Sequence, residues 1–178
     1  IKELDTRSKK IKKNNKALFL KTHSFLGQYH GEPFTTNEYT LGGIYIVRDP
    51  RNVITSVMNH FTLDVEDAFK FMTNTDKNTM DPNSKDYRTW VFLNNWSSHY
   101  SSWCKSKNFR KLIIKYEDFE SDKYETFRDI IVFTNTLLNR TERVDKKKLE
   151  RAIETTNFNV LKNKEKNEGF DEAQYNKK

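Results

Sequence analysis

The sequence predicts an α/β fold, a three-layer sandwich in which a central parallel β-sheet is flanked by helices. Three short apolar runs, at residues 17–20, 44–47 and 112–114, each end in polar residues. Their apolarity is continuous rather than alternating, which is typical of strands that are covered on both faces. Segments with helical periodicity lie between and after these runs, and this alternation predicts a parallel sheet between helices.

Helical patterns follow the second and third predicted strands. The first of these helices starts with Asp49, a good N-cap residue, and Pro50, which suits the first helical turn. Further helices are predicted where apolar residues recur at helical spacing, at about 88–105, 127–138 and 149–153, the last capped by Asp145. From about Lys162 onward few apolar residues occur, and the chain predicts a mobile tail or loop.

The 178 residues are predicted to form a single domain, 1–178. The sequence shows no internal repeat and no linker rich in Pro or Gly, with only 5 Gly and 3 Pro. We expect a core of about 17–162, with weak order at 1–16 and 163–178. Because the chain starts at Ile1 rather than Met, we also expect it to be a truncated or partly ordered piece of the protein.

Charge and cysteine content narrow the functional classes. The 32 basic and 25 acidic residues leave a net charge of +7, which fits either a solvated surface or a partner rich in phosphate. The single cysteine, Cys104, excludes an intramolecular disulfide framework. No apolar run approaches the ~20 residues of a membrane span, and no signal peptide is evident. We therefore expect a cytoplasmic protein without a membrane span.

Functional side chains follow each of the three predicted strands. Lys21 and His23 follow the first strand, Arg48 follows the second and Tyr116 follows the third. In open parallel α/β sheets, ligands bind beyond the carboxyl ends of the strands. These four residues are therefore candidates for one site.

Arg48 has the richest surroundings. It directly precedes a predicted helix N-terminus, whose free N–H groups and dipole attract anions, and Ser56 lies two turns into that helix. A planar guanidinium matches phosphate oxygens. From these residues alone two interpretations stay open: a phosphate site, or an ion pair of Arg48 with a carboxylate such as Asp118.

The segment Tyr45–Ser56 resembles the 3′-phosphate-binding signature of cytosolic sulfotransferases, in which a strand ends in Arg and Ser follows eight residues later. Three further segments resemble motifs of that family, in the same order. They are 20–23 (Lys-Thr-His), 112–118 (a strand ending in Tyr-Glu-Asp) and 155–158 (Thr-Ser-Phe, with Asn157 in place of Ser). The resemblance covers about 18–162 and implies the P-loop NTPase-like sulfotransferase fold.

For the nucleotide, the resemblance implies binding of 3′-phosphoadenosine 5′-phosphosulfate (PAPS) as donor and of 3′-phosphoadenosine 5′-phosphate (PAP) as product. Arg48 and Ser56 would bind the 3′-phosphate. Tyr116 would lie near the adenine, with Thr156 and Phe158 also on the nucleotide.

For catalysis, the resemblance implies that His23 is the general base, since a His with a pKa near neutrality can take the proton of a hydroxyl or amine. Lys21 would stabilise charge at the reacting centre. The acceptor is a small molecule, lipid or carbohydrate. No cluster of His, Cys and carboxylates has metal-site spacing, so we expect no metal.

Three departures from the family pattern leave the predicted fold incomplete at both ends. Residues 1–16 lack the family's Gly- and Ser-rich loop with a Lys for the 5′-phosphosulfate, and no Arg-Lys-Gly loop or dimerisation motif occurs near the C-terminus. One alternative is therefore a catalytically degenerate nucleotide-binding or interaction module.

Two other functional classes, a nucleic-acid-binding domain and a small-molecule kinase, fit the sequence less well. A small nucleic-acid-binding domain would suit the net charge, but the tryptophans follow helical core spacing rather than forming a stacking platform, so we expect no nucleic acid as partner. A small-molecule kinase would need a Gly-x-x-x-x-Gly-Lys-Ser/Thr loop, which this sequence lacks.

Overall fold

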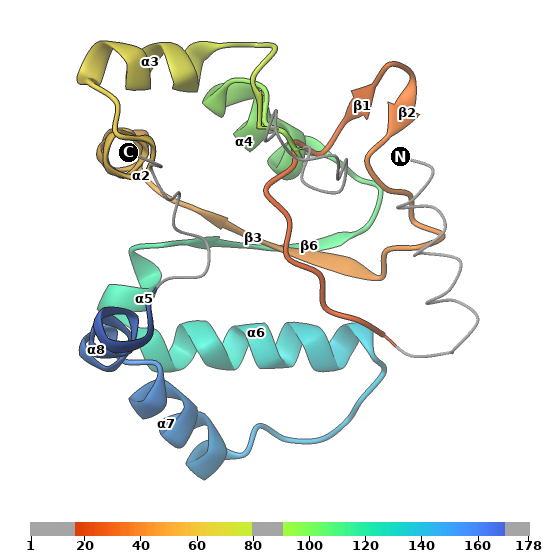
Figure 1. Cartoon of the computed structure of the whole chain (residues 1–178). Helices are drawn as coiled ribbons and strands as arrows, with labels where there is room; N and C mark the ends of the chain where they lie inside the picture. Colours follow the sequence, from red (N-terminus) through yellow and green to blue (C-terminus); the bar gives the residue numbers. More distant parts are fainter. Residues whose placement is uncertain (1–16, 80–90, 170–178) are drawn as a thin grey trace. The chain divides into compact units, whose positions relative to one another are not determined.

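The computed structural model describes residues 17–79 and 91–169, which fall into two compact units (Figure 1). The first unit comprises Ile1–Tyr45 and Val65–Ile113, and the second comprises Ile46–Asp64 and Ile114–Lys178. Strands β3 (Gly42–Val47) and β6 (Arg110–Lys115) pair with each other, and both pass from the first unit into the second. They run in the same direction (Figure 1). The predicted α/β class with a parallel sheet is confirmed; the single-domain boundaries stay a prediction.

Two of the three predicted strands are present, and the third prediction is wrong. Strands β3 and β6 contain the runs 44–47 and 112–114 and extend each by at least one residue. The run 17–20 forms no strand, and Leu18, Phe19 and Leu20 are 60–77% exposed. An apolar run becomes a strand only when its backbone N–H and C=O groups form hydrogen bonds with a neighbouring strand. No described strand pairs with residues 17–20.

In its described residues, the first unit contains two helices and two short antiparallel pairs of strands. The helices are α3 (Val65–Thr73) and α4 (Trp96–Lys105); the strands are β1 (Gln28–Tyr29) with β2 (Glu32–Pro33), and β4 (Asn78–Thr79) with β5 (Val91–Phe92). Asn95 caps α4 by accepting from the backbone N–H of Ser98. The helix therefore starts later than the predicted residue 88, because β5 occupies residues 91–92.

Aromatic rings form the centre of the first unit. Trp103 on α4 is 7% exposed, and its ring lies parallel to that of Tyr45, with centroids 5.2 Å apart. Phe109 meets Trp103 edge-on at 6.4 Å. A Cβ at Gly43 would lie 3.1 Å from both Trp103 and Phe109, so a larger residue at this position would force these rings to shift by a few tenths of an ångström.

The second unit contains α2 (Pro50–Phe61) and a helical C-terminal part. That part comprises α5 (Asp118–Ser121), α6 (Lys123–Leu137), α7 (Lys146–Thr155) and α8 (Phe158–Glu168). Helix α6 packs against α5 and α7, and Leu149 on α7 is buried. The predicted caps are confirmed: Asp49 accepts from the N–H of Arg51, and Asp145 accepts from that of Lys148.

Helix α8 corrects the predicted tail. Residues 162–168, predicted as mobile or loop, continue this helix to Glu168, and it has no buried residue. Its N-terminus is capped by Asn157, and such a cap, rather than an apolar stripe, starts the helix. The remaining predicted tail, 170–178, lies outside the described residues, as does 1–16.

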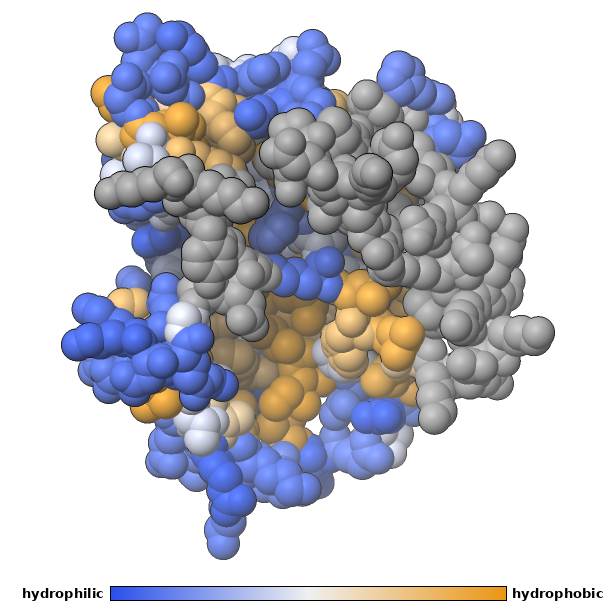
Figure 2. Space-filling model, viewed as in Figure 1, coloured by the Kyte–Doolittle hydropathy of each residue, from blue (hydrophilic) through white to orange (hydrophobic). Residues whose placement is uncertain are grey.

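Apolar side chains remain visible on the surface, as the orange areas of Figure 2 show. The exposed ones include Phe69 on α3, Val132 on α6 and Phe158 on α8. Among the described residues, no helix combines the length and apolarity that crossing a membrane requires.

Candidate functional site

The carboxyl ends of β3 and β6 are joined by a hydrogen bond. The backbone N–H of Tyr116 donates to the carbonyl oxygen of Val47 at 2.7 Å. This bond places Arg48, the residue after β3, beside Tyr116, the residue after β6. The Arg48 Cζ lies 4.5 Å from the centroid of the Tyr116 ring, a cation–π contact on a ring that is 38% exposed.

Arg48 also reaches Ser56 on α2. The Arg48 Nη1 donates to the Ser56 Oγ at 3.3 Å, so the two predicted phosphate ligands converge. The Nε of Arg48 is buried and has no acceptor within the part of the chain that the structure describes. Buried N–H groups almost always have a hydrogen-bond partner. The group therefore has an unused donor, and the chemistry of a phosphate oxygen fits it.

The alternative interpretation, an ion pair between Arg48 and Asp118, is not found. Within residues 17–79 and 91–169, no carboxylate lies within ion-pair distance of Arg48. The Asp118 Oδ2 instead accepts from the backbone N–H of Lys115 at 3.1 Å. The positive charge of Arg48 is thus available to an anion.

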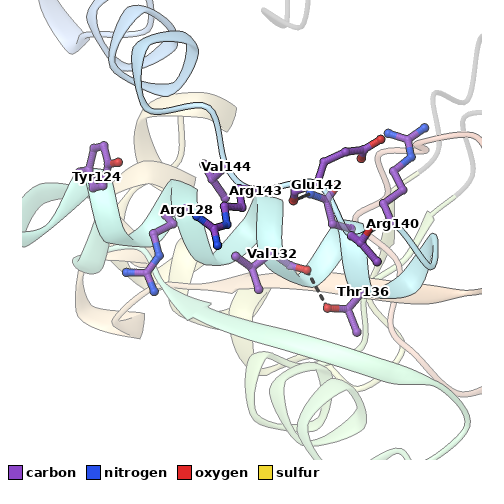
Figure 3. Close-up of a pocket in the computed structure, with 10 residues that line it drawn as sticks. Tyr124, Arg128, Val132, Thr136, Arg140, Glu142, Arg143 and Val144 are labelled. Carbon is purple, nitrogen blue, oxygen red and sulfur yellow. Dashed lines mark hydrogen bonds between the residues drawn. The ribbon is translucent and has the colours of Figure 1, made fainter.

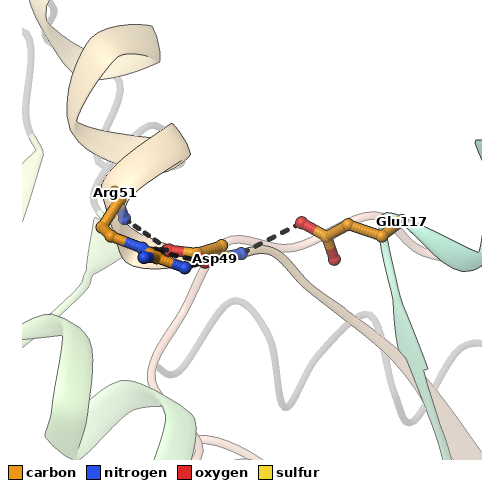
Figure 4. Close-up of polar contacts among 3 residues, drawn as sticks. All are labelled: Asp49, Arg51 and Glu117. Carbon is orange, nitrogen blue, oxygen red and sulfur yellow. Dashed lines mark hydrogen bonds and ion pairs between the residues drawn. The ribbon is translucent and has the colours of Figure 1, made fainter.

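The neighbouring arginine behaves differently. Arg51, at the start of α2, is 88% exposed and pairs with Asp49, with 2.5 Å between Nη2 and Oδ2 (Figure 4). The hydrogen bonds from Arg51 lower the pKa of Asp49 to about 2. On the other side, the Oε1 of Glu117 accepts from the backbone N–H of Asp49 at 3.3 Å. Asp49 and Glu117 thus fix the turn after Arg48, and neither carboxylate pairs with the Arg48 guanidinium.

Thr156 and Phe158 lie at the junction between α7 and α8. Thr156 ends α7, and its Oγ1 donates to the carbonyl of Ala152 at 2.7 Å. Phe158 begins α8 and is exposed. Asn157 caps the N-terminus of α8, and Ser, the residue that the family pattern has at this position, is an equally good N-cap. No described contact joins either predicted nucleotide residue to Arg48, and their role stays a prediction.

Lys21 and His23 belong to the first unit and are exposed. His23 lies in an irregular segment, and its imidazole forms no hydrogen bond with a described residue. Its backbone carbonyl is 3.0 Å from the Nε2 of His99 on α4. Among the described residues, the predicted base therefore combines a bonded backbone with a ring that has no hydrogen-bond partner. Its catalytic role stays a prediction.

Sequence reasoning missed the part played by α4. It predicted a helix at about 88–105 with core spacing of the tryptophans, yet His99 and Trp103 on this helix both bond the segment that carries His23. Burial lowers the pKa of His99. Only the spacing of His99 and Trp103, on one helical face, could have indicated a shared target.

A cavity of about 430 Å³ lies elsewhere in the second unit, between α6 and residues 140–144 (Figure 3). Three arginines line it, but they do not converge: Arg128 and Arg140 point in different directions, and Arg128 pairs with Glu125. None of the predicted site residues lines this cavity. The described residues also hold no group of three His, Cys, Asp or Glu suited to a metal ion.

Comparison with known proteins points to one family. The model of the family described as the sulfotransferase domain matches residues 2–176, nearly the whole chain. A comparison with curated proteins finds no match.

Proposed function

The chain belongs to the sulfotransferase domain family, and from this premise we propose that it transfers a sulfuryl group from PAPS to a hydroxyl or amine. The observation that carries the proposal is the Arg48–Ser56–Tyr116 group. It combines a cation without a carboxylate partner, a hydroxyl at 3.3 Å and an aromatic ring at 4.5 Å.

This group has the chemistry that a 3′-phosphate needs. Arg48 offers a planar guanidinium whose Nε–H has no acceptor among the described residues, and such a group suits the oxygens of a phosphate. Ser56 adds a hydroxyl, and the free N–H groups at the start of α2 add a positive dipole end. The Tyr116 ring offers a face for the adenine. We include Thr156 and Phe158 as further nucleotide contacts on the family pattern alone.

In the reaction, the donor supplies the sulfuryl group, which becomes bonded to the acceptor atom as its bond to the 5′-phosphate breaks in line, leaving PAP. His23 takes the proton of the acceptor hydroxyl or amine on its imidazole. Lys21 places a positive charge at the reacting centre. Such transfer depends mainly on alignment and charge stabilisation. The acceptor is a small molecule, lipid or carbohydrate, and a cytoplasmic location remains part of this proposal.

Calorimetric titration with PAP tests the nucleotide site. Arg48→Ala should weaken binding by about 1.5–3 kcal/mol, or roughly 10- to 150-fold, because it removes hydrogen bonds between charged groups. The matched control is Arg51→Ala, on the same turn, which removes the same charge from a side chain already paired with Asp49. Its PAP affinity should change less than about threefold. Equal losses in both variants would reduce the site to general charge attraction and refute the assignment.

The same protein tests the base. His23→Ala should leave PAP binding intact and abolish transfer of labelled sulfate from PAPS to a phenol such as 2-naphthol. Wild-type protein that binds PAP but transfers no sulfate to a panel of hydroxyl and amine acceptors would favour the alternative, a degenerate nucleotide-binding module.

A further inference from the structure

The segment that carries His23 is held by one face of helix α4. The Nε2 of His99 is 3.0 Å from the carbonyl oxygen of His23, and the indole Nε1 of Trp103 donates to that of Ser24 at 3.0 Å. Between them, the Ser102 Oγ accepts from the backbone N–H of Leu26 at 3.1 Å. Ser102 and Trp103 follow His99 by three and four residues, so each lies on the same side of the helix as His99.

These bonds matter because few other hydrogen bonds join this segment to the rest of the described chain, where Phe25 also packs edge-on against Phe92. Residues 17–25 form no regular structure, and the bond from the N–H of Phe25 to the carbonyl of Phe92, at 2.8 Å, is the one backbone–backbone bond that 17–26 makes with described residues. Leu26 is buried and anchors the far end. The position of the His23 backbone therefore depends on side chains of α4.

The direction of the His99 bond fixes the state of its ring. A carbonyl oxygen only accepts, so Nε2 carries the hydrogen. Burial disfavours the imidazolium, and the neutral ring then presents the Nδ1 lone pair to the Tyr45 hydroxyl at 3.1 Å. Burial likewise raises the pKa of Tyr45 to about 12, so the phenol keeps its proton and donates it to Nδ1. The result is a chain of two hydrogen bonds, in which Tyr45 donates to His99 and His99 donates to the carbonyl of His23.

We propose that His99 is a positioning residue for sulfuryl transfer, which holds the backbone of His23 through Nε2 while Tyr45 holds His99. This inference rests on the proposed function, in which His23 is the base. Its bond reaches the backbone of the residue that would take the proton and leaves the His23 ring free. Misplacement of a reacting group by about 1 Å can reduce a rate about 100-fold.

Two variants separate the hydrogen bond from packing. His99→Phe keeps a planar ring but removes both nitrogens, whereas His99→Gln places an amide N–H near the position of Nε2. Amide hydrogen exchange of the whole chain is followed at Phe25 and Leu26, and sulfate transfer from PAPS to 2-naphthol is measured in parallel. We expect His99→Phe to raise exchange at these amides at least about 10-fold and to lower kcat about 100-fold. His99→Gln should restore most of both, and PAP affinity should stay constant in both variants.

The outcomes distinguish this inference from the proposed function. Unchanged exchange and kcat in His99→Phe, together with loss of transfer in His23→Ala, would overturn the positioning role alone. Full transfer by His23→Ala would overturn the proposed base and this inference with it. If the wild type does not turn over 2-naphthol, amide hydrogen exchange at Phe25 and Leu26 tests the inference. Equal exchange rates in the wild type and His99→Phe would refute the positioning role of His99. Faster exchange in His99→Phe that returns to the wild-type rate in His99→Gln would support it.

Discussion

The hydrogen bond from the Trp103 indole to the His23 segment should contribute to the free energy of unfolding, and a substitution of Trp103 can measure this contribution. Trp103→Phe keeps an aromatic ring at the centre of the first unit but removes the N–H that donates to the Ser24 carbonyl at 3.0 Å. It also shortens the ring that lies against Tyr45 and Gly43. Trp96→Phe is the matched control on the same helix, because Trp96 stacks on Tyr100 and its indole has no hydrogen bond to a described residue.

The cost of Trp103→Phe follows from two losses. A half-buried carbonyl left without its donor costs about 1 kcal/mol, the lower end for such groups, since water reaches it in part. The smaller ring gives up contacts at a site that is 7% exposed, worth roughly 1–2 kcal/mol. The total is about 2–3 kcal/mol, against about 1 kcal/mol or less for Trp96→Phe.

Urea unfolding followed by far-UV circular dichroism measures the difference. With a slope of about 2 kcal/mol per molar urea, Trp103→Phe should lower the midpoint by about 1 M, and Trp96→Phe by less than half of that. Circular dichroism is chosen because both variants alter tryptophan fluorescence. Equal midpoints for the two variants would refute the claim that the indole bond to the His23 segment stabilises the first unit.

Two further predictions concern stability. Burial lowers the pKa of His99 below its unfolded value of 6.5, so the unfolded chain binds the proton more readily than the folded chain. The unfolding free energy should therefore fall as the pH drops through 6.5, and it should level off below the folded pKa. His99→Gln should lack this component, and a wild-type-minus-variant difference that is equal at pH 8 and pH 5 would contradict it. In the second unit, Asp145→Ala should lower the unfolding free energy by about 1 kcal/mol because the N–H of Lys148 loses its cap, whereas Asp145→Asn should cost little; the readout is again urea unfolding.

The nucleotide side of the site was predictable because its signals are local. A strand that ends in Arg48 and a helix started by Asp49 and Pro50 fix the backbone on either side of the turn. Ser56, two helical turns further, then faces back toward the helix start. The distance of 3.3 Å between Arg48 Nη1 and Ser56 Oγ follows from these local rules. The sequence could not say whether Arg48 contacts Tyr116 or Asp118, because both residues closely follow the end of β6. The structure shows the contact with Tyr116.

The features that sequence reasoning missed depend on distant partners. The run 17–20 has the composition of a strand, yet strand formation needs a neighbour that composition does not name. His99 shows the same limit: its spacing assigns it to a helix, but the carbonyl of His23 lies 76 residues away. Helix α8 was missed for the opposite reason, since its start depends on one cap and it buries no residue.

Strand β3 passes from the first unit, which contains Tyr45, into the second, which contains Arg48 directly after the strand. Tyr45 on this strand bonds His99, which bonds the backbone of His23, and Arg48 at the end of the same strand binds the phosphate in the proposal. A shift of the strand by one residue would turn each side chain to the opposite face, so both groups would be lost together. At Gly43 a Cβ would lie 3.1 Å from the Trp103 ring, so a shift that brought Ile44 to this position would crowd the indole and is disfavoured.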